Sequence, residues 1–202
     1  MTLTAPPFSP AADRNKHSIL GGLQGLLAPQ GQALEIASGT GQHAVWFADA
    51  LPAWSWQPTD ADATALPGLS QRVAHARHGN VRAPVLLDVL AASWPVAAAY
   101  DLVFCANMLH IAPWSTCAAL MRGAARHLAD DGRLVVYGPF LEDAVRTAPG
   151  NLAFDESLRE RNPQWGIRRL EDVCTTAADA GLALCERQSL PANNLLLVFG
   201  RR

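Results

Sequence analysis

The hydrophobic positions of this chain form two kinds of segment that alternate along it. Short runs such as residues 33–37 and 100–109 are almost continuously apolar, as in strands buried on both faces of a parallel sheet. Longer segments between them space their apolar residues three or four apart, which is typical of helices. This alternation predicts an α/β fold built around a mostly parallel sheet.

The same pattern gives approximate bounds for each element. We expect strands at residues 33–37, 54–60, 81–89, 100–109, 133–140, 182–190 and 193–202. We expect helices over about 9–27, 40–51, 63–76, 114–130, 153–161 and 168–180. Only Pro191-Ala192 links the last two strands, and that link is too short for a parallel crossover, so these strands must form an antiparallel hairpin.

The chain has 202 residues, which suits one domain with a sizeable core better than two. Residues 1–202 are therefore taken as a single domain. Residues 141–167 are richer in charge and are punctuated by prolines and glycines. We interpret them as an insertion near the substrate side that acts as a lid or as a dimer contact.

The sequence LEIASGTGQHA, at residues 34–44, makes the bend between the first strand and its helix. Gly39 and Gly41 permit tight backbone geometry with no Cβ in the way. The free N–H groups at the start of the helix favour an anionic or polar ligand group. Ligands of open parallel sheets bind beyond the carboxyl ends of the strands, so this bend is predicted to form a pocket floor.

The glycines alone do not identify the ligand. Residues 39–44 satisfy the G-x-G-x-x-A form of the dinucleotide fingerprint. Asp60, at the end of the second strand, would bind ribose hydroxyls whether or not the ligand is a dinucleotide. Two features distinguish this sequence from the dinucleotide fingerprint. Glu35 precedes Gly39 by four residues, and Asp88 follows a third strand without a standard role in dinucleotide binding.

The pattern E-x-x-x-G-x-G, acids that end the second and third strands, and a terminal hairpin together resemble the class I S-adenosylmethionine-dependent methyltransferases. The resemblance implies a Rossmann-like three-layer α/β/α fold with a seven-stranded, mostly parallel sheet whose last strand is antiparallel. One position departs from the pattern, because Ala37 stands where the first motif glycine is usual.

Seven further stretches spread over Ser9 to Phe199 resemble the methyltransferase-like protein 26 family, a group of unknown function with no settled substrate. They are SPAADRNK, LEIASGTGQHA, WQPTD, NMLHIAPW, YGPF, FDESLRERNPQWG and PANNLLLVF.

The class resemblance implies S-adenosylmethionine as cofactor, S-adenosylhomocysteine as product, and no metal. Its methionine end would lie against the bend residues Ser38, Gly39, Thr40 and Gly41, and Glu35, inside the first strand, would orient its ammonium group. Asn107 and Met108, at the end of the fourth strand, would pass under the sulfonium. Asp60 would accept from both ribose hydroxyls, Asp88 from the adenine amino group, and Val89 would lie against the ring. A strand-ending Asp is also an ordinary helix N-cap, so Asp88 has this second interpretation.

Methyl transfer requires alignment and exclusion of water, with a base only where the nucleophile carries a proton. His110 is three residues past Asn107, and an unperturbed imidazole suits a general base. The alternative is a histidine that caps a helix or bonds a loop carbonyl. Further candidates for the substrate wall or a lid are Arg14, Asn15, Trp114, Tyr137 and Asn151.

Composition narrows the partners. Only 17% of residues are charged, and the net charge is −2, so no basic face for nucleic acid is expected and a small-molecule acceptor is favoured. No run of about eighteen apolar residues, no signal-peptide pattern and no CxxC among the four cysteines occur, so we expect a cytoplasmic protein without a membrane span. A homodimer is compatible with the sequence.

Two other functions stay open. An NADP-dependent oxidoreductase could use the same bend, but Lys16 is the only lysine and no Tyr-x-x-x-Lys pair is present. A non-catalytic protein could retain the cofactor pocket as a binding module.

Overall fold

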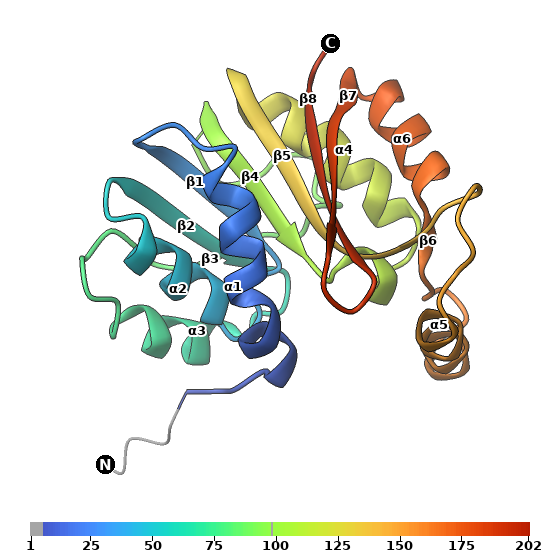
Figure 1. Ribbon diagram of the computed structural model, residues 1–202. Helices are drawn as coiled ribbons and strands as arrows, with labels where there is room; N and C mark the ends of the chain where they lie inside the picture. Colours follow the sequence, from blue (N-terminus) through green and yellow to red (C-terminus); the bar gives the residue numbers. More distant parts are fainter. Residues whose placement is uncertain (1–5, 98) are drawn as a thin grey trace.

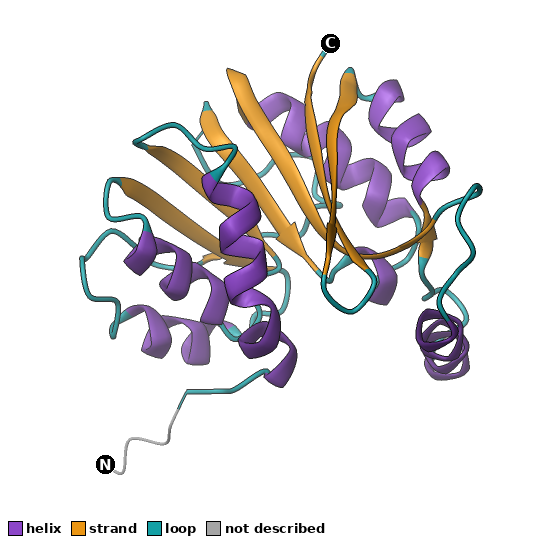
Figure 2. Ribbon diagram, viewed as in Figure 1, coloured by secondary structure: helices purple, strands orange, loops and turns teal. Residues whose placement is uncertain are grey.

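The computed structural model describes residues 6–97 and 99–202, as a twisted sheet covered by helices on both faces (Figures 1 and 2). Seven strands follow the order β3-β2-β1-β4-β5-β8-β7, and β6 pairs with β5 off this path. The strands are β1 (Gly31–Ile36), β2 (Trp54–Asp60), β3 (Val85–Leu86), β4 (Tyr100–Ala106), β5 (Leu128–Leu141), β6 (Arg168–Arg169), β7 (Leu182–Leu190) and β8 (Asn194–Arg201). The helices are α1 (Pro10–Gln24), α2 (Gln42–Ala50), α3 (Leu66–Val73), the short 3-10 helix η1 (Leu109–Ile111), α4 (Ser115–His127), α5 (Pro149–Arg161) and α6 (Leu170–Asp179).

The predicted fold is confirmed. β1 pairs in parallel with β2 and β4, and β4 pairs in parallel with β5, while the last strand, β8, runs antiparallel to β5 and β7. The turn between β7 and β8 places Ala192 and Asn193 at φ values of 61° and 56°. Two successive left-handed residues are what a tight hairpin turn needs.

Several predicted bounds were wrong. The fourth strand ends three residues earlier than expected, at Ala106, and α3 spans only Leu66–Val73. The strand expected over 81–89 is ladder-paired only at Val85–Leu86, with one isolated bridge from Trp56 to Val81. Pro84 has no N–H to donate, and the Gln57 side chain bonds the Ala83 carbonyl at 2.9 Å instead. β5 begins at Leu128, so α4 ends three residues earlier than expected, and α5 begins four residues earlier, at Pro149.

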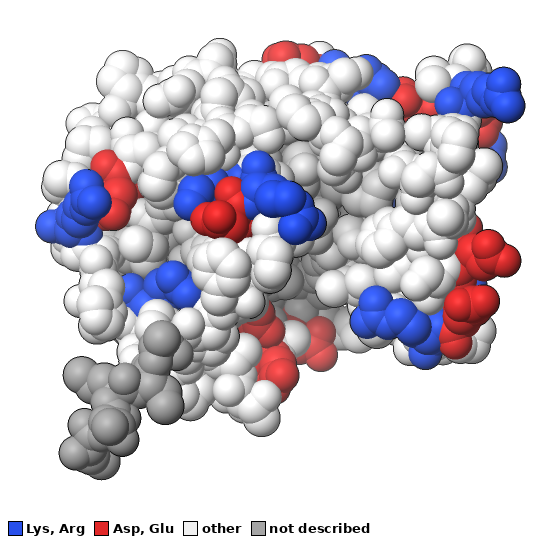
Figure 3. All heavy atoms as spheres, turned by 60° about the horizontal axis from the view of Figure 1, so that its bottom comes forward, with Lys and Arg blue, Asp and Glu red and all other residues white. Residues whose placement is uncertain are grey.

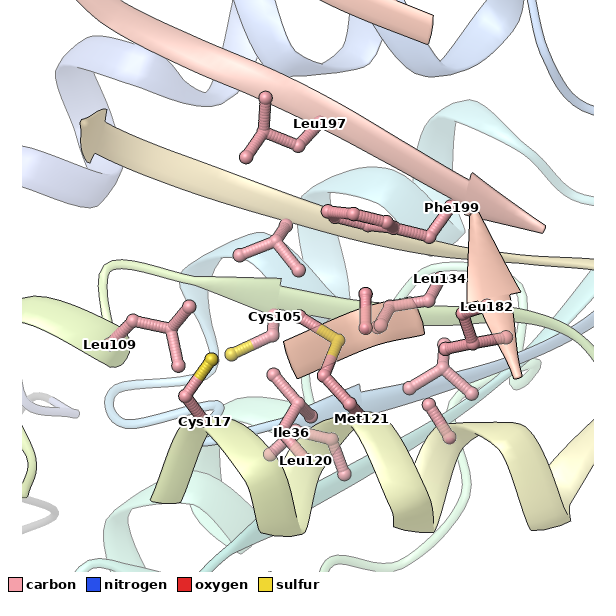
Figure 4. Close-up of a cluster of buried hydrophobic side chains, with 14 of the residues drawn as sticks. Ile36, Cys105, Leu109, Cys117, Leu120, Met121, Leu134, Leu182, Leu197 and Phe199 are labelled. Atoms are coloured by element: carbon pink, nitrogen blue, oxygen red, sulfur yellow. The ribbon is translucent and has the colours of Figure 1, made fainter. Parts of the chain in front are cut away.

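Successive side chains of each strand point to opposite faces of the sheet, so they pack into two separate cores. Along β4, Val103 and Cys105 face α4 and α6, whereas Leu102 and Phe104 face α1 and α2. Figure 4 shows part of the first core, in which Cys105, Cys117 and Met121 lie together between β4 and α4. Side chains alternate between the two faces of the sheet along β1 as well. Glu35, between Leu34 and Ile36, therefore lies on the face that α1 and α2 cover.

All four cysteines are free thiols, and two of them, Cys105 and Cys117, are buried in the core that faces α4 and α6.

Among the described residues, no helix combines the length and apolar character that a membrane span requires.

Candidate functional site

A cavity of about 980 Å³ opens beyond the carboxyl ends of the parallel strands. Its wall comes from α1, the bend after β1, the end of β2, the loop after β4, α5 and the β7–β8 turn. Eleven residues singled out in the sequence line it: Arg14, Asn15, Ser38, Gly39, Thr40, Asp60, Asn107, Met108, His110, Tyr137 and Asn151. Elements far apart in the chain therefore converge on one pocket at the sheet end where ligands of open α/β folds bind.

The bend after β1 has an unusual backbone. Gly39 and Gly41 have φ values of 52° and 72°, and a Cβ on Gly41 would approach Leu69 Cδ1 to 2.4 Å. Ala37 also has a left-handed φ, of 56°. The position where the sequence lacks the usual glycine thus retains the conformation that glycine adopts freely, with some backbone strain.

Asp60 connects the end of β2 to this bend. Its Oδ2 accepts a 2.8 Å hydrogen bond from the Gly39 N–H, and its Oδ1 accepts one of 2.9 Å from the Asp62 N–H. A carboxylate offers about four lone-pair directions, so each oxygen of Asp60 can accept one further hydrogen bond from a ligand. The half-buried side chain lines the cavity, which suits it to a vicinal diol.

Glu35 is turned into the protein. It is 2% exposed and does not line the cavity, and its Oε2 accepts a 2.6 Å hydrogen bond from Trp56 Nε1. Burial raises the pKa of Glu35 to about 8, against the opposing effect of the Trp56 and Ser38 hydrogen bonds. Any action of Glu35 on a ligand would therefore pass through the bend, because its carboxyl group does not face the cavity.

Four other predicted site residues do not line the cavity: Gly41, Asp88, Val89 and Trp114. The exposed Asp88 accepts the Leu90 N–H at 2.9 Å and so closes a turn beyond β3. Val89 is buried in the core that faces α4 and α6. The Arg168 guanidinium carbon lies 5.7 Å from the centre of the Trp114 ring. Their proposed contacts to adenine and substrate stay predictions.

Asn15 links three elements at the pocket wall. Its Oδ1 lies 2.7 Å from His43 Nε2, which donates to it, and it hydrogen-bonds the buried Tyr137 side chain. Burial lowers the pKa of His43 to about 4, so this imidazole is neutral at pH 7. Arg14, next to Asn15, is exposed at the cavity rim.

His110 lies on η1 and faces the cavity with a ring that is 7% exposed. Burial, and secondarily the Arg168 charge, lower the pKa of His110 to about 4. The Phe154 ring of α5 packs edge-on against it at 5.5 Å. Within the described part of the chain, no side chain hydrogen-bonds this imidazole, so its neutral ring can accept a hydrogen bond from a ligand.

The sequence analysis missed the residues that hold these loops. Arg168 donates to the carbonyl of Leu109 at 2.9 Å and to that of Ala112, fixing η1. Gln42 Oε1 accepts from the Thr40 hydroxyl at 3.0 Å, and its amide also bonds the Ser9 backbone, which ties the start of α1 to the bend. The position of Gln42 directly after Gly41 was the available signal.

Charge around the cavity is sparse and mixed. On the face that Figure 3 shows, a group of blue and red side chains lies above the hollow, and red side chains lie at its lower edge. No group of three His, Cys, Asp or Glu side chains in the described ranges is arranged to hold a metal ion.

Solved structures that share this fold include several methyltransferases. The methyltransferase SibL matches with a TM-score of 0.79 at 23% identity, over 95% of this chain and 55% of its own. An O-methyltransferase family protein from Burkholderia thailandensis matches with a TM-score of 0.79 at 18% identity, over 95% and 57%. Human N-acetylserotonin methyltransferase, solved with SAM, gives 0.79 at 14% identity, over 95% and 52%. The chain thus spans just over half the length of these proteins, and at these identities the likeness establishes the fold.

Residues 6–201 match the family described as "Protein of unknown function (DUF938)", so the chain belongs to that family. The finer resemblance to the methyltransferase-like protein 26 family stays a prediction.

Proposed function

We propose that this protein is an S-adenosylmethionine-dependent methyltransferase that acts on a small molecule. The observation that carries the proposal is the pairing of the left-handed bend at residues 37–41 with the Asp60 carboxylate on one cavity wall. The fold of the structural neighbours supports it.

The residues present suit the cofactor. Asp60 has unused acceptor capacity for ribose hydroxyls, and Ser38, Gly39 and Thr40 offer a narrow floor for the methionine end. Arg14 at the rim provides a cation for a carboxylate. Bound there, S-adenosylmethionine supplies an electrophilic methyl group on a sulfonium.

The cavity continues beyond Asn107 and Met108 toward α5 and the β7–β8 turn, and this second half is where we place the methyl acceptor. Its walls include the apolar side chains of Ile111, Phe154 and Pro139. His110, between the two halves, would take the proton of an O–H or N–H nucleophile. Enclosure by these walls would exclude water from the reacting atoms.

Titration calorimetry with S-adenosylhomocysteine tests this proposal. Asp60→Ala should weaken binding by about a hundredfold, because two hydrogen bonds to a charged group are lost. Asp62→Ala, two residues along the same loop but outside the cavity lining, is the matched control and should stay within about threefold of wild type. Equal affinities in both variants would contradict the assignment of Asp60.

A further inference from the structure

A smaller cavity adjoins the acceptor half of the main one. It has a volume of about 240 Å³ and is lined by the loop after β5, the start of α5 and the β7–β8 hairpin. The two cavities share Asn151, Asn193 and Asn194 in their walls. Asn151 Nδ2 donates to the Asn193 carbonyl at 3.1 Å, so this bond joins α5 to the hairpin turn at the boundary.

The charges that line the smaller cavity do not cancel. Glu142 holds Arg187 in a bidentate pair, with Oε1–Nη2 at 2.6 Å and Oε2–Nε at 2.9 Å. The nearby Asp143 is engaged by Arg169 across the same loop. Arg146 also lines the cavity, and no carboxylate of the described residues lies within ion-pair distance of it. The lining therefore carries one uncompensated guanidinium, with the neighbouring acids already occupied.

The main cavity has apolar walls in its acceptor half, which adjoins the smaller cavity. Phe154 and Ile111 both line it and are 39% and 45% exposed, so both can contact a ligand. Exposed apolar groups in a cavity indicate an apolar ligand surface. An unpaired guanidinium at one end of such a surface favours a carboxylate or phosphate, which it can bind through two parallel hydrogen bonds.

We propose that the methyl acceptor is an amphipathic acid, whose apolar or aromatic body lies on Phe154 and Ile111 and whose anionic group enters the smaller cavity beside Arg146. This inference rests on the proposed function, because it assigns the acceptor half of the same site. It also explains the two-part shape of the pocket: the cofactor is held at Asp60 and the acceptor's acid group is held at the other end.

Ligand titration of the protein saturated with S-adenosylhomocysteine tests the inference. The probes are matched pairs of one- and two-ring aromatic acids and their neutral amides, such as 4-hydroxybenzoate with 4-hydroxybenzamide, and phenyl phosphate with phenol. Wild type should bind the anionic member of at least one pair about tenfold more tightly. The carboxylate and phosphate arms show which anion is preferred.

Variants assign the preference to the guanidinium. Arg146→Gln should remove the preference for the acid, and Arg146→Lys should retain part of it, because the charge remains while the bidentate geometry is lost. Arg122→Gln, on the exposed face of α4 and outside both cavities, is the control and should leave the preference unchanged. Absence of any acid preference across the pairs, or a preference that survives Arg146→Gln, would overturn the inference.

Failure of the proposed function is distinguishable. If S-adenosylhomocysteine itself does not bind, the cofactor assignment fails along with the inference. If it binds while the acids show no preference, only the assignment of the acceptor is wrong.

Discussion

The N–H of Gly39 donates a 2.8 Å hydrogen bond to Oδ2 of Asp60, which joins the bend after β1 to the last residue of the neighbouring parallel strand β2. The bond fixes the bend after β1 against the end of β2 before any ligand arrives. It also orients the carboxylate, because one lone pair of each oxygen is already used by the backbone. A ligand that binds here meets a site whose geometry is largely set, which reduces the entropy lost on binding.

Ala37 allows a direct test of strain in this bend. Its φ of 56° costs a non-glycine residue roughly 1–2 kcal/mol, while glycine adds roughly 0.5–1 kcal/mol of unfolded-state entropy. Ala37→Gly should therefore raise the free energy of unfolding by about 0.5–1 kcal/mol. Urea denaturation measures this. Ala178→Gly, in the ordinary helical backbone of α6, should instead lower it by about 1 kcal/mol. A loss of stability in Ala37→Gly would show that the bend is unstrained.

Glu35 should make the protein less stable as pH rises. Its folded pKa of about 8 lies above the ordinary 4.5, so between these values the folded state holds a proton that the unfolded state has released. This contribution to stability is complete below pH 4.5 and is lost as pH rises toward 8. Glu35→Gln keeps an acceptor for Trp56 without the titration. Its stability relative to wild type should rise by about 1.4 kcal/mol per pH unit across this window.

Unfolding midpoints of both proteins at several pH values between 5 and 8 check this. A stability difference that does not change with pH would mean that the Glu35 carboxyl is already ionised in the folded protein.

His110 and His43 should make the protein less stable as pH falls, which is the opposite of the effect of Glu35. Each has a folded pKa of about 4, below the ordinary 6.5, so the unfolded state binds more protons between these values. Stability should fall as pH drops from 6.5 to 4, by up to about 3 kcal/mol for each histidine. His110→Gln should reduce the slope by one proton. Identical slopes in the variant and the wild-type protein would argue against a neutral buried His110.

His110 also has a predicted role in turnover. If it takes the proton of the acceptor, His110→Asn should lower kcat by about a hundredfold or more, with S-adenosylhomocysteine affinity within about threefold of wild type. Transfer of labelled methyl groups from S-adenosylmethionine into a pool of small-molecule acids measures kcat, and calorimetry measures the affinity. Full turnover in the variant would leave His110 as a structural residue that packs against Phe154.

Much of the fold could be predicted because local pattern and global topology agree. The apolar runs at β1, β4 and β8 are buried on both faces, and the short Pro191-Ala192 link forced the hairpin. The edge strand was the weak point, because the apolar residues of 81–89 predicted a longer strand than β3, which pairs with one neighbour over Val85–Leu86 only. Long-range pairing, rather than local sequence, decides how much of such a segment is a strand.

The residues of the candidate site also fall into those that the sequence could place and those that it could not. Residues at strand ends, such as Asp60 and Asn107, could be placed because topology alone brings the strand ends together. The direction of the Glu35 side chain depended on its partner Trp56, which lies 21 residues away on another strand. The contributions of Phe154, in the insertion, and Arg168, in β6, depended on how these segments fold back onto the cavity, which no periodicity encodes.

Whether this pocket binds the methyl donor decides every other assignment made for it. Calorimetric titration of the wild-type protein with S-adenosylmethionine, S-adenosylhomocysteine and NADPH measures this. We expect micromolar binding of both sulfur ligands and none of NADPH. Binding of NADPH alone, or of none of the three, would contradict this expectation, and the resemblance to methyltransferases would then extend to the fold only.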